Sequence, residues 1–288
     1  MKDANFLHCE SMLREQDPDR YFASLFAPPS HRPHLFAIHA FSSEVARIRD
    51  AITQTLAGEI RLQWWRDVIA GSDGAHVGES SANPVAAALE ATITRFDLPR
   101  QPLLDLIEAR THDLYDDPVA TLNDLEGYCG ETVSALFRLS ALVLADGEDP
   151  GAADAAGYAG VAYGMTGLMR AFPFHVRRGQ LYVPPVEVLE RHALSRGDVV
   201  AGRADAVRLG AALAEMRAHA RRRLGEAETA LRGIDPRIGV AFLPLAIVPL
   251  HLDAMEARDY APYESLVEVP RWRKLWRLWR RARRGWRA

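Results

Sequence analysis

The sequence predicts an all-α protein, and three observations carry this prediction. Apolar residues recur at intervals of three and four over long stretches, as at Leu35, Ile38, Phe41 and Val45, which is the spacing of one face of an α-helix. Strict alternation of apolar and polar residues over the length of a strand is hard to find, and Asn-Gly and Asp-Gly hairpin signals barely occur. The chain has 288 residues, 48% of them hydrophobic, which suffices for a large helical core.

The periodic segments predict each helix in turn. Ser30 is a candidate cap for the first helix, and Pro33 falls in its first turn, where proline is tolerated. Trp64 and Trp65 are adjacent in the next helix, so only one of them can face the core. The small residues of 157–164 fit close packing between helices better than a phosphate loop. We expect helices at about 31–53, 58–70, 83–96, 100–114, 121–145, 151–172, 185–193, 204–232, 237–256 and 268–286, with breaks at 71–82, 146–151 and 196–204.

Cysteine content and apolar runs predict a soluble chain in a reducing compartment. Cys9 and Cys129 are too few for a disulfide framework or a zinc cluster, so we expect free thiols. The N-terminal segment mixes acids and bases and shows neither a secretory signal nor an Arg-rich presequence. The apolar run 240–252 contains Pro244 and falls short of the ~20 residues needed to cross a bilayer. We therefore expect a kinked core helix there and a cytoplasmic protein.

Positive charge is concentrated at the C-terminus. The segment 271–288 holds nine Lys/Arg and no acid, so removing it from the net charge of −3 leaves −12 for residues 1–270. We expect one helical domain over 1–267 and a basic tail over 268–288. The tryptophans of the tail are spaced four, three and seven residues apart, which places them on one helical face. The residues expected to meet a membrane or a partner are Trp272, Trp276, Trp279, Arg280, Arg284 and Trp286.

A tail of this composition suits the membrane interface. Indole rings favour headgroup depth, and cations meet anionic lipid there. The alternatives for the same segment are contact with the acidic body of the chain, with a protein partner or with RNA. We favour the membrane surface and expect no specific nucleic acid.

Two other features resemble sites but have simpler interpretations. His31, His34 and His39 have no acid or cysteine among them, so we expect a solvated helix entry rather than a metal site. Asp113 and Asp117 stand four apart, as a Mg²⁺ pair would, but a proline follows directly and favours a frayed helix end. Walker, dinucleotide-binding and GxSxG motifs are absent from the sequence.

Five segments in a fixed order resemble the squalene/phytoene synthase family. They contain, in order, the motifs R..LFA.HAF, WWRD, NPVAAALE, YC and LMRA…RRGQLYVP, and they fall within 19–52, 60–71, 83–99, 125–147 and 165–195. The resemblance implies an isoprenoid-synthase fold, a helical bundle around a central cavity. In active members, two aspartate-rich segments face each other across that cavity and hold Mg²⁺ ions that bridge the diphosphates of prenyl substrates. Arginines and a tyrosine help grip the phosphates.

This chain departs from the family pattern at the acids. Ala46 and Arg47 stand where the first motif has its paired acids, and Ala171 stands where the second motif has one. Asp50 keeps the end of the first motif, and we expect either it or Glu44 to pair with Arg170. The candidate catalytic residues are Asp50, Tyr128 and Arg170, within a ligand- or anion-binding cavity lined by Glu44, Arg47, Asp50, Tyr128, Arg170, His175, Arg177, Arg178 and Tyr182. We expect no metal site.

The segment LMRAFPFH…RR…LYVP resembles one branch most, the complex I assembly factor 6 group and its bacterial relatives. This branch carries an Arg-Ala-x-Pro-x-His sequence in place of the second acid motif. The resemblance implies a non-catalytic factor without a cofactor, peripheral on the inner face of a bacterial inner membrane, with complex I peripheral-arm subunits as partners. The alternative is an active Mg²⁺-dependent head-to-head prenyl transferase acting on farnesyl or geranylgeranyl diphosphate. Binding of a lipid or a prenyl diphosphate without turnover is compatible with the first interpretation, which we favour.

Overall fold

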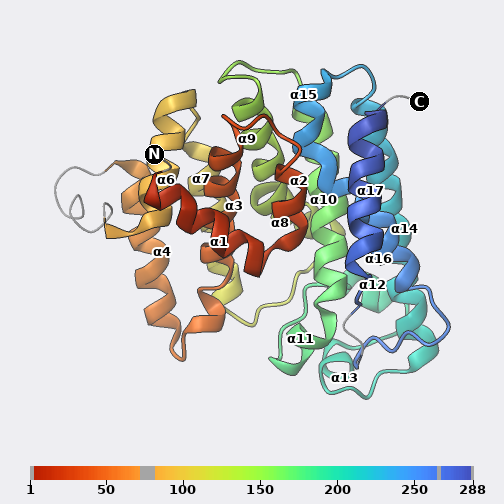
Figure 1. Ribbon diagram of the computed structural model, residues 1–288. Coiled ribbons are helices and arrows are strands. Elements are labelled where there is room, and N and C mark those ends of the chain that lie inside the picture. Colours follow the sequence, from red (N-terminus) through yellow and green to blue (C-terminus); the bar gives the residue numbers. More distant parts are fainter. Residues whose placement is uncertain (1–2, 72–81, 265–266, 287–288) are drawn as a thin grey trace.

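The structure, a computed structural model, describes residues 3–71, 82–264 and 267–286. Within these ranges the chain forms helices and no strand, which confirms the predicted all-α class. The helices pack into one bundle (Figure 1). In chain order they are α1 (Ala4–Gln16), α2 (Pro18–Ser24), α3 (Arg32–Ala46), α4 (Thr55–Ala70), α6 (Pro84–Phe96), α7 (Gln101–Thr111), α8 (Leu122–Cys129), α9 (Ala135–Leu144), α10 (Ala153–Arg170), α11 (Phe172–Arg177), α12 (Val186–Arg191), α13 (Arg196–Val200), α14 (Ala206–Ala230), α15 (Pro236–Gly239), α16 (Val248–Ala254) and α17 (Arg271–Arg284).

Other helical segments also belong to the bundle. The 3-10 helices are η1 (Arg49–Ala51), η2 (His112–Leu114) and η4 (Val240–Ile247), and η3 (Gly130–Ser134) is a π-helix. The helix predicted over 31–53 ends earlier, at Ala46, and η1 follows as a separate turn, which carries Asp50 off the axis of α3. Helices α1 and α2 were not predicted. Only Cys9 and Leu13 of α1 are buried, so its apolar stripe is too short to give a clear periodic signal.

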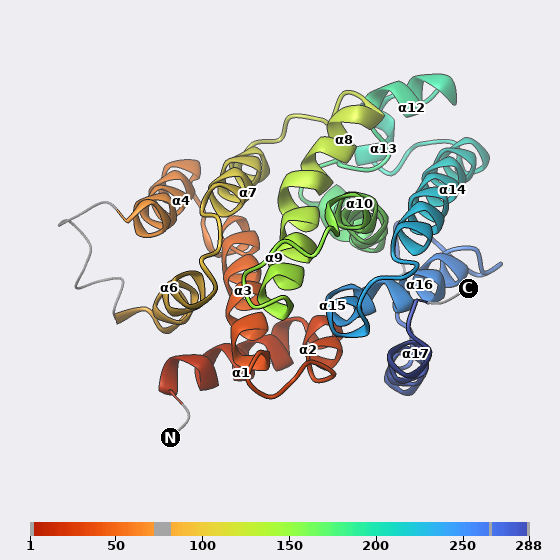
Figure 2. The same cartoon turned by 90° about the horizontal axis from the view of Figure 1, so that it is seen from above.

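Helices α3, α9 and α10 lie inside a ring formed by the other helices (Figure 2). α10 packs most extensively against α14 and η3. A Cβ added at Gly160 would lie 2.5 Å or less from the Ser134 backbone and hydroxyl, and one at Gly164 would lie 2.9 Å from the Cys129 sulfur. The small residues of this helix therefore permit close contact between helices, as predicted. Cys129 and Cys9 are both buried free thiols, also as predicted.

The apolar segment 240–252 is a core element. Pro244 lies in η4, and α16 continues from it, so the segment is kinked as predicted. Phe242 is fully buried and stacks on Phe137 with ring centroids 5.6 Å apart. By length and composition, residues 236–254 could cross a membrane, and 67% of that window is buried inside the fold. The protein core therefore covers most of this apolar surface.

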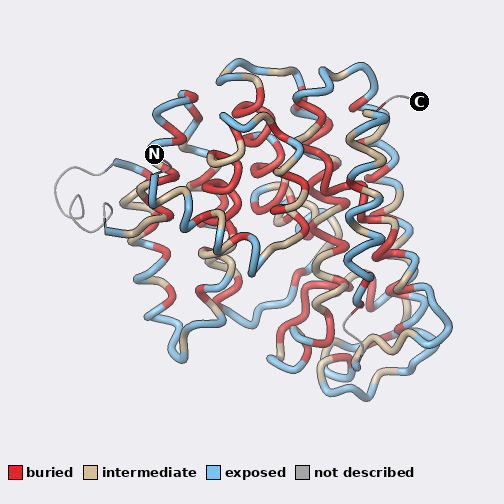
Figure 3. The backbone as a smooth tube through the Cα atoms, viewed as in Figure 1, coloured by how far each residue is buried: buried red, intermediate tan, exposed pale blue. Residues whose placement is uncertain are grey.

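Helix α17 lies at the edge of the bundle (Figure 2), and its outward side is exposed (Figure 3). Leu278 is buried against Leu243 and Ile247 of η4, which fixes the inner side of the helix. Gly285 has a φ of 65° and ends the helix, so the chain turns back. Trp286 is buried and its Nε1 donates a hydrogen bond of 2.9 Å to the Gly239 carbonyl. The prediction that Trp286 shares an exposed face with the other tail tryptophans was wrong.

Gly160→Ala tests the close packing of α10. We expect this variant to be less stable by about 1–3 kcal/mol, because the new methyl group overlaps the backbone of η3 and one element must move. Gly157→Ala is the matched control, since a Cβ there meets nothing within 4 Å and alanine is the better helix former. Chemical denaturation of both variants measures the difference. Equal stability of the two would contradict the packing assignment.

Candidate functional site

A buried carboxylate, that of Asp113 in η2, organises one end of the bundle. Its Oδ1 accepts hydrogen bonds from the hydroxyls of Tyr128 (2.8 Å) and Tyr182 (2.9 Å). Its Oδ2 accepts one from Arg110 of α7 at 2.9 Å, and the same guanidinium nitrogen donates to the Tyr128 hydroxyl at 2.7 Å. Gln180 donates to the Asp113 carbonyl at 2.9 Å. Elements distant in sequence therefore converge on one acid. We call this group the Asp113 cluster; its members are Arg110, Asp113, Tyr128 and Tyr182.

Burial keeps the two tyrosines of the Asp113 cluster protonated. Burial, reinforced by the nearby Asp113 charge, raises the pKa values of Tyr128 and Tyr182 well above the usual range, so both phenols remain hydrogen-bond donors. Burial alone would lower the pKa of Arg110, but the neighbouring side chains of Tyr128 and Asp113 outweigh burial and raise it. The cluster is thus a charge-compensated buried ion pair with two neutral donors.

A histidine and a second ion pair lie beside the cluster. The His175 ring packs on Tyr182 with centroids 4.8 Å apart. Burial lowers the pKa of His175 to about 4 against the opposing effect of Asp113 and Asp50, so the ring is neutral near pH 7. Arg178 forms an ion pair with Asp50 and lies over the Phe174 ring at 4.0 Å from its centroid. The structure therefore brings five predicted residues to one region: Asp50, Tyr128, His175, Arg178 and Tyr182.

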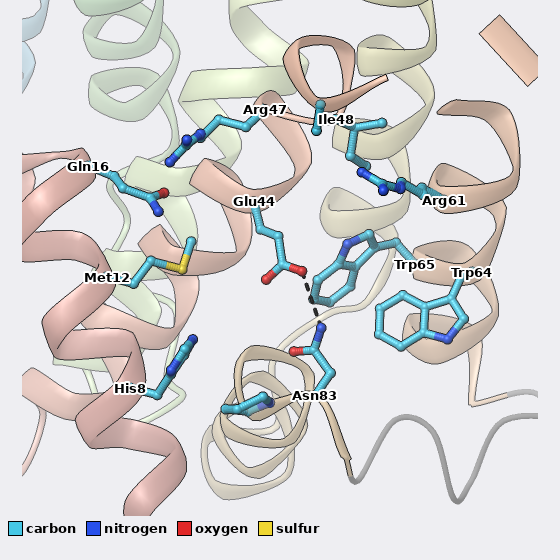
Figure 4. Close-up of a pocket in the computed structure, with 12 residues that line it drawn as sticks. His8, Met12, Gln16, Glu44, Arg47, Ile48, Arg61, Trp64, Trp65 and Asn83 are labelled. Carbon is cyan, nitrogen blue, oxygen red and sulfur yellow. Dashed lines mark hydrogen bonds between the residues drawn. The ribbon is translucent and has the colours of Figure 1, made fainter. Parts of the chain in front are cut away.

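Glu44 and Arg47 line a different space. They lie on the side of α3 that faces a groove of about 610 Å³ between α1, α3, α4 and α6 (Figure 4). Glu44 accepts a hydrogen bond of 3.2 Å from Asn83. Trp64 and Trp65 also line the groove, and of the two only Trp65 is fully buried, which confirms that the pair is split between core and surface.

Arg170 pairs with an acid that the sequence did not suggest. Its terminal nitrogen lies 4.0 Å from Asp19 of α2, and Lys274 of α17 contacts the same carboxylate at 2.6 Å. Burial alone would raise the pKa of Asp19, but His251, Lys274 and Arg170 together lower it to about 2. His251 lies 3.8 Å from the carboxylate, beyond hydrogen-bond distance. The predicted pairing of Arg170 with Asp50 or Glu44 was wrong, and Arg177 is exposed on α11.

The histidines near the start of α3 form separate core contacts. His31, His34 and His39 are all at least 91% buried, so the prediction of a solvated helix entry was wrong. His31 is hydrogen-bonded to Asp146 at 2.8 Å and His34 to Thr92 at 2.9 Å. They do not converge on a common point.

Asp113 and Arg110 were missed as site residues. The expected frayed end at Asp113 is instead a buried turn, whereas Asp117 is exposed and does not join Asp113. The i, i+3 spacing of Arg110 and Asp113 is the sequence signal that indicates their pairing.

The arrangement does not fit the Mg²⁺ cluster that active family members use. Mg²⁺ requires oxygen ligands that are free to coordinate it. The oxygens of Asp113 already accept three side-chain hydrogen bonds, and Asp50 is paired with Arg178. In the part of the chain that the structure describes, no three His, Cys, Asp or Glu side chains gather as a metal site would require.

Asp113→Ala tests whether the Asp113 cluster holds this end of the bundle. We expect a loss of about 3–5 kcal/mol in unfolding free energy, because Arg110 would keep a buried charge without its partner. Asp117→Ala removes an exposed carboxylate from the same segment, so we expect its stability to stay within about 0.5 kcal/mol of the parent chain. Urea denaturation measures both variants. A small loss for Asp113→Ala, similar to that of the control, would contradict the assignment.

Comparison with curated proteins gives two groups of relatives. The complex I assembly factor 6 of Rattus norvegicus is 31% identical over 192 residues, and that of Bos taurus 30% identical over 191 residues. These matches cover 67% and 66% of this chain and 56% of each relative, so the chain spans a little over half the length of these relatives. The 15-cis-phytoene synthase of Synechocystis is 27% identical over 280 residues, covering 93% of this chain and 81% of that protein.

Solved structures confirm the predicted fold. A dehydrosqualene synthase in complex with ligand superposes with a TM-score of 0.81 at 18% identity, covering 97% of this chain and 95% of the other. The squalene synthase HpnC of Alicyclobacillus acidocaldarius superposes with a TM-score of 0.71 at 24% identity, covering 88% and 93%. The bundle is therefore an isoprenoid-synthase-like fold.

The family assignment rests on the sequence as a whole. The squalene/phytoene synthase family model matches residues 13–280, which include every element from the end of α1 into α17. This chain therefore belongs to the squalene/phytoene synthase family.

Proposed function

We propose that this chain is a non-catalytic member of its family that associates with the membrane and assists assembly of respiratory complex I. The observation that carries the proposal is that the carboxylates of this region are already occupied by partners within the chain, while Ala46, Arg47 and Ala171 stand where the resemblance places further acids. Asp113 is saturated by Arg110 and two tyrosines, and Asp50 is paired with Arg178. The similarity to complex I assembly factor 6 over two thirds of the chain supports the same function.

The chemistry of the family explains why this neutralisation matters. A departing diphosphate carries several negative charges, which Mg²⁺ neutralises as the bond breaks. Arginines bind a diphosphate without metal, but they do not replace carboxylates as Mg²⁺ ligands. A site whose acids already hold arginines is therefore suited to anion binding or to structure rather than to ionisation of a prenyl diphosphate.

Helix α17 supports membrane association. Trp272, Trp276 and Trp279 are 69%, 50% and 48% exposed and lie at steps of four and three, so they form an outward ridge. Arg280 and Arg283 stack over Trp276 and Trp279 at 5.2 Å. Large indole rings beside cations favour the headgroup region of a bilayer. We infer that this ridge docks the chain on the cytoplasmic face of the inner membrane.

The second candidate function is an active head-to-head prenyl transferase that acts on farnesyl or geranylgeranyl diphosphate. One observation favours it: the match to phytoene synthase extends over 93% of this chain, further than the match to the assembly factors. This function would need Mg²⁺, and hence the opening of the Asp50–Arg178 pair or the release of Asp113 from its donors.

A turnover assay separates the two functions. We expect the purified chain to release no diphosphate from farnesyl or geranylgeranyl diphosphate with Mg²⁺ and NADPH, beyond a heat-killed control. The reason is that no free pair of carboxylates faces the substrate among the residues described above. Release that Asp50→Ala abolishes would overturn the proposal and establish the synthase.

The assembly function has its own readout. In a strain that lacks this gene, the parent chain and Asp50→Ala should both restore NADH:quinone reductase activity, because the Asp50–Arg178 pair is partly exposed and contributes about 0–1 kcal/mol. A deletion strain with normal reductase activity would contradict a function in complex I assembly.

Point variants test the membrane ridge. We expect Trp272→Ala/Trp276→Ala/Trp279→Ala to lower affinity for phosphatidylglycerol-containing vesicles by roughly tenfold or more, since burying one large apolar side chain contributes about 1.5–3 kcal/mol. Leu56→Ala/Ile60→Ala is the control, because both side chains are more than 60% exposed on α4, away from α17. Vesicle flotation measures binding. Unchanged flotation of the tryptophan variant would exclude this surface.

A further inference from the structure

An arginine-lined pocket lies between α17 and the segment formed by η4 and α16. Its volume is about 520 Å³, within the range of small-molecule sites. One wall is cationic and comes from α17, and the opposite wall is apolar and comes from η4 and α16. The lining residues are Arg277, Arg280, Arg281 and Arg284, with Glu228, Leu245, Ala246, Pro249 and Gly285.

Within the described residues, three of the four arginines have no acidic partner. Arg281 pairs with Glu228 of α14. Among the described residues, no carboxylate lies within 4.0 Å of Arg277, Arg280 or Arg284. The buried Nε of Arg277 also has no hydrogen-bond partner in those ranges. Three like charges within two turns of one helix repel one another, so the pocket is stabilised when an anion enters it.

The pocket adjoins the tryptophan ridge. Steps of three and four place Arg277, Arg280 and Arg284 on one stripe of α17, beside the stripe of Trp272, Trp276 and Trp279. Arg280 belongs to both features, since it lines the pocket and lies over Trp276. When the indoles reach headgroup depth, the three guanidinium groups reach the depth of lipid phosphates.

We propose that this pocket binds the phosphodiester headgroup of an anionic phospholipid, with Arg277, Arg280 and Arg284 as its phosphate ligands. The proposal rests on the membrane association proposed above. Guanidinium groups bind phosphate oxygens in a bidentate manner. The apolar wall of Leu245 and Pro249 suits the glycerol and first acyl carbons. Nucleic acid fits less well, because the exposed rings of Trp272 and Trp279 do not line the pocket where a base would stack.

A monomeric lipid tests the pocket without a membrane. The full chain is titrated by calorimetry with dihexanoylphosphatidylglycerol below its micelle concentration, and in parallel with dihexanoylphosphatidylcholine, inorganic phosphate and single-stranded RNA. We expect saturable one-to-one binding of the anionic lipid, and much weaker binding of the other three probes. Equal binding of inorganic phosphate, or tighter binding of RNA, would overturn the proposal.

Charge-matched variants locate the site on α17. Arg277→Gln/Arg284→Gln should weaken binding of the monomeric anionic lipid by about tenfold or more, because two charge-assisted contacts are lost. Arg271→Gln/Arg273→Gln removes the same charge from exposed positions of α17 outside the pocket, and we expect an effect within about threefold because neither side chain lines the pocket and exposed charges are screened. Equal losses in the two variants would overturn the assignment of the pocket.

Vesicle binding distinguishes failure of the pocket from failure of the proposed function. A chain that floats with phosphatidylglycerol vesicles but does not bind the monomeric lipid would overturn the pocket and leave membrane association standing. A chain that does neither would overturn both. Unchanged thermal unfolding of the arginine variants controls for folding.

Discussion

The carboxylate of Asp113 is the constraint on which one end of this bundle depends. A buried charge is tolerated only when its neighbours neutralise it and satisfy its oxygens. Here Arg110 supplies the charge, and the hydroxyls of Tyr128 and Tyr182 supply the remaining donors. The cluster ties α7, α8 and the segment after α11 to one point. The Arg110 guanidinium of the chain itself therefore neutralises this acid.

The periphery of the bundle follows the same principle. Asp19 is held by Arg170 from the end of α10 and by Lys274 from α17. Further along the chain, Leu278 and Trp286 add apolar contacts, so α17 is integrated into the fold although its outer face carries three exposed tryptophans. The helix thus has two faces: one contacts the protein and the other is exposed.

Local features were predictable from the sequence, and long-range pairings were not. Periodicity in three and four predicted the core helices, because burial of one face imposes that pattern. It missed α1, where only Cys9 and Leu13 are buried, and α2, which at seven residues is too short for a periodic signal. Motif order predicted that Asp50, Tyr128, His175, Arg178 and Tyr182 meet. The partner of Arg170 depends on where the packing of α2 against α3 and η4 places Asp19, which no local pattern encodes. Trp286 left the predicted face because Gly285 redirects the chain.

The Asp19 carboxylate, which contacts both Lys274 and Arg170, couples α17 to the end of α10. Because one anion serves a cation from α17 and a cation from the core helix α10, the position of α17 and the conformation at the end of α10 are thermodynamically linked. If Lys274 moves away from Asp19, Arg170 is the arginine or lysine that still neutralises this carboxylate. Linkage is reciprocal, so a ligand that engages Arg170 would in turn alter how firmly α17 is held.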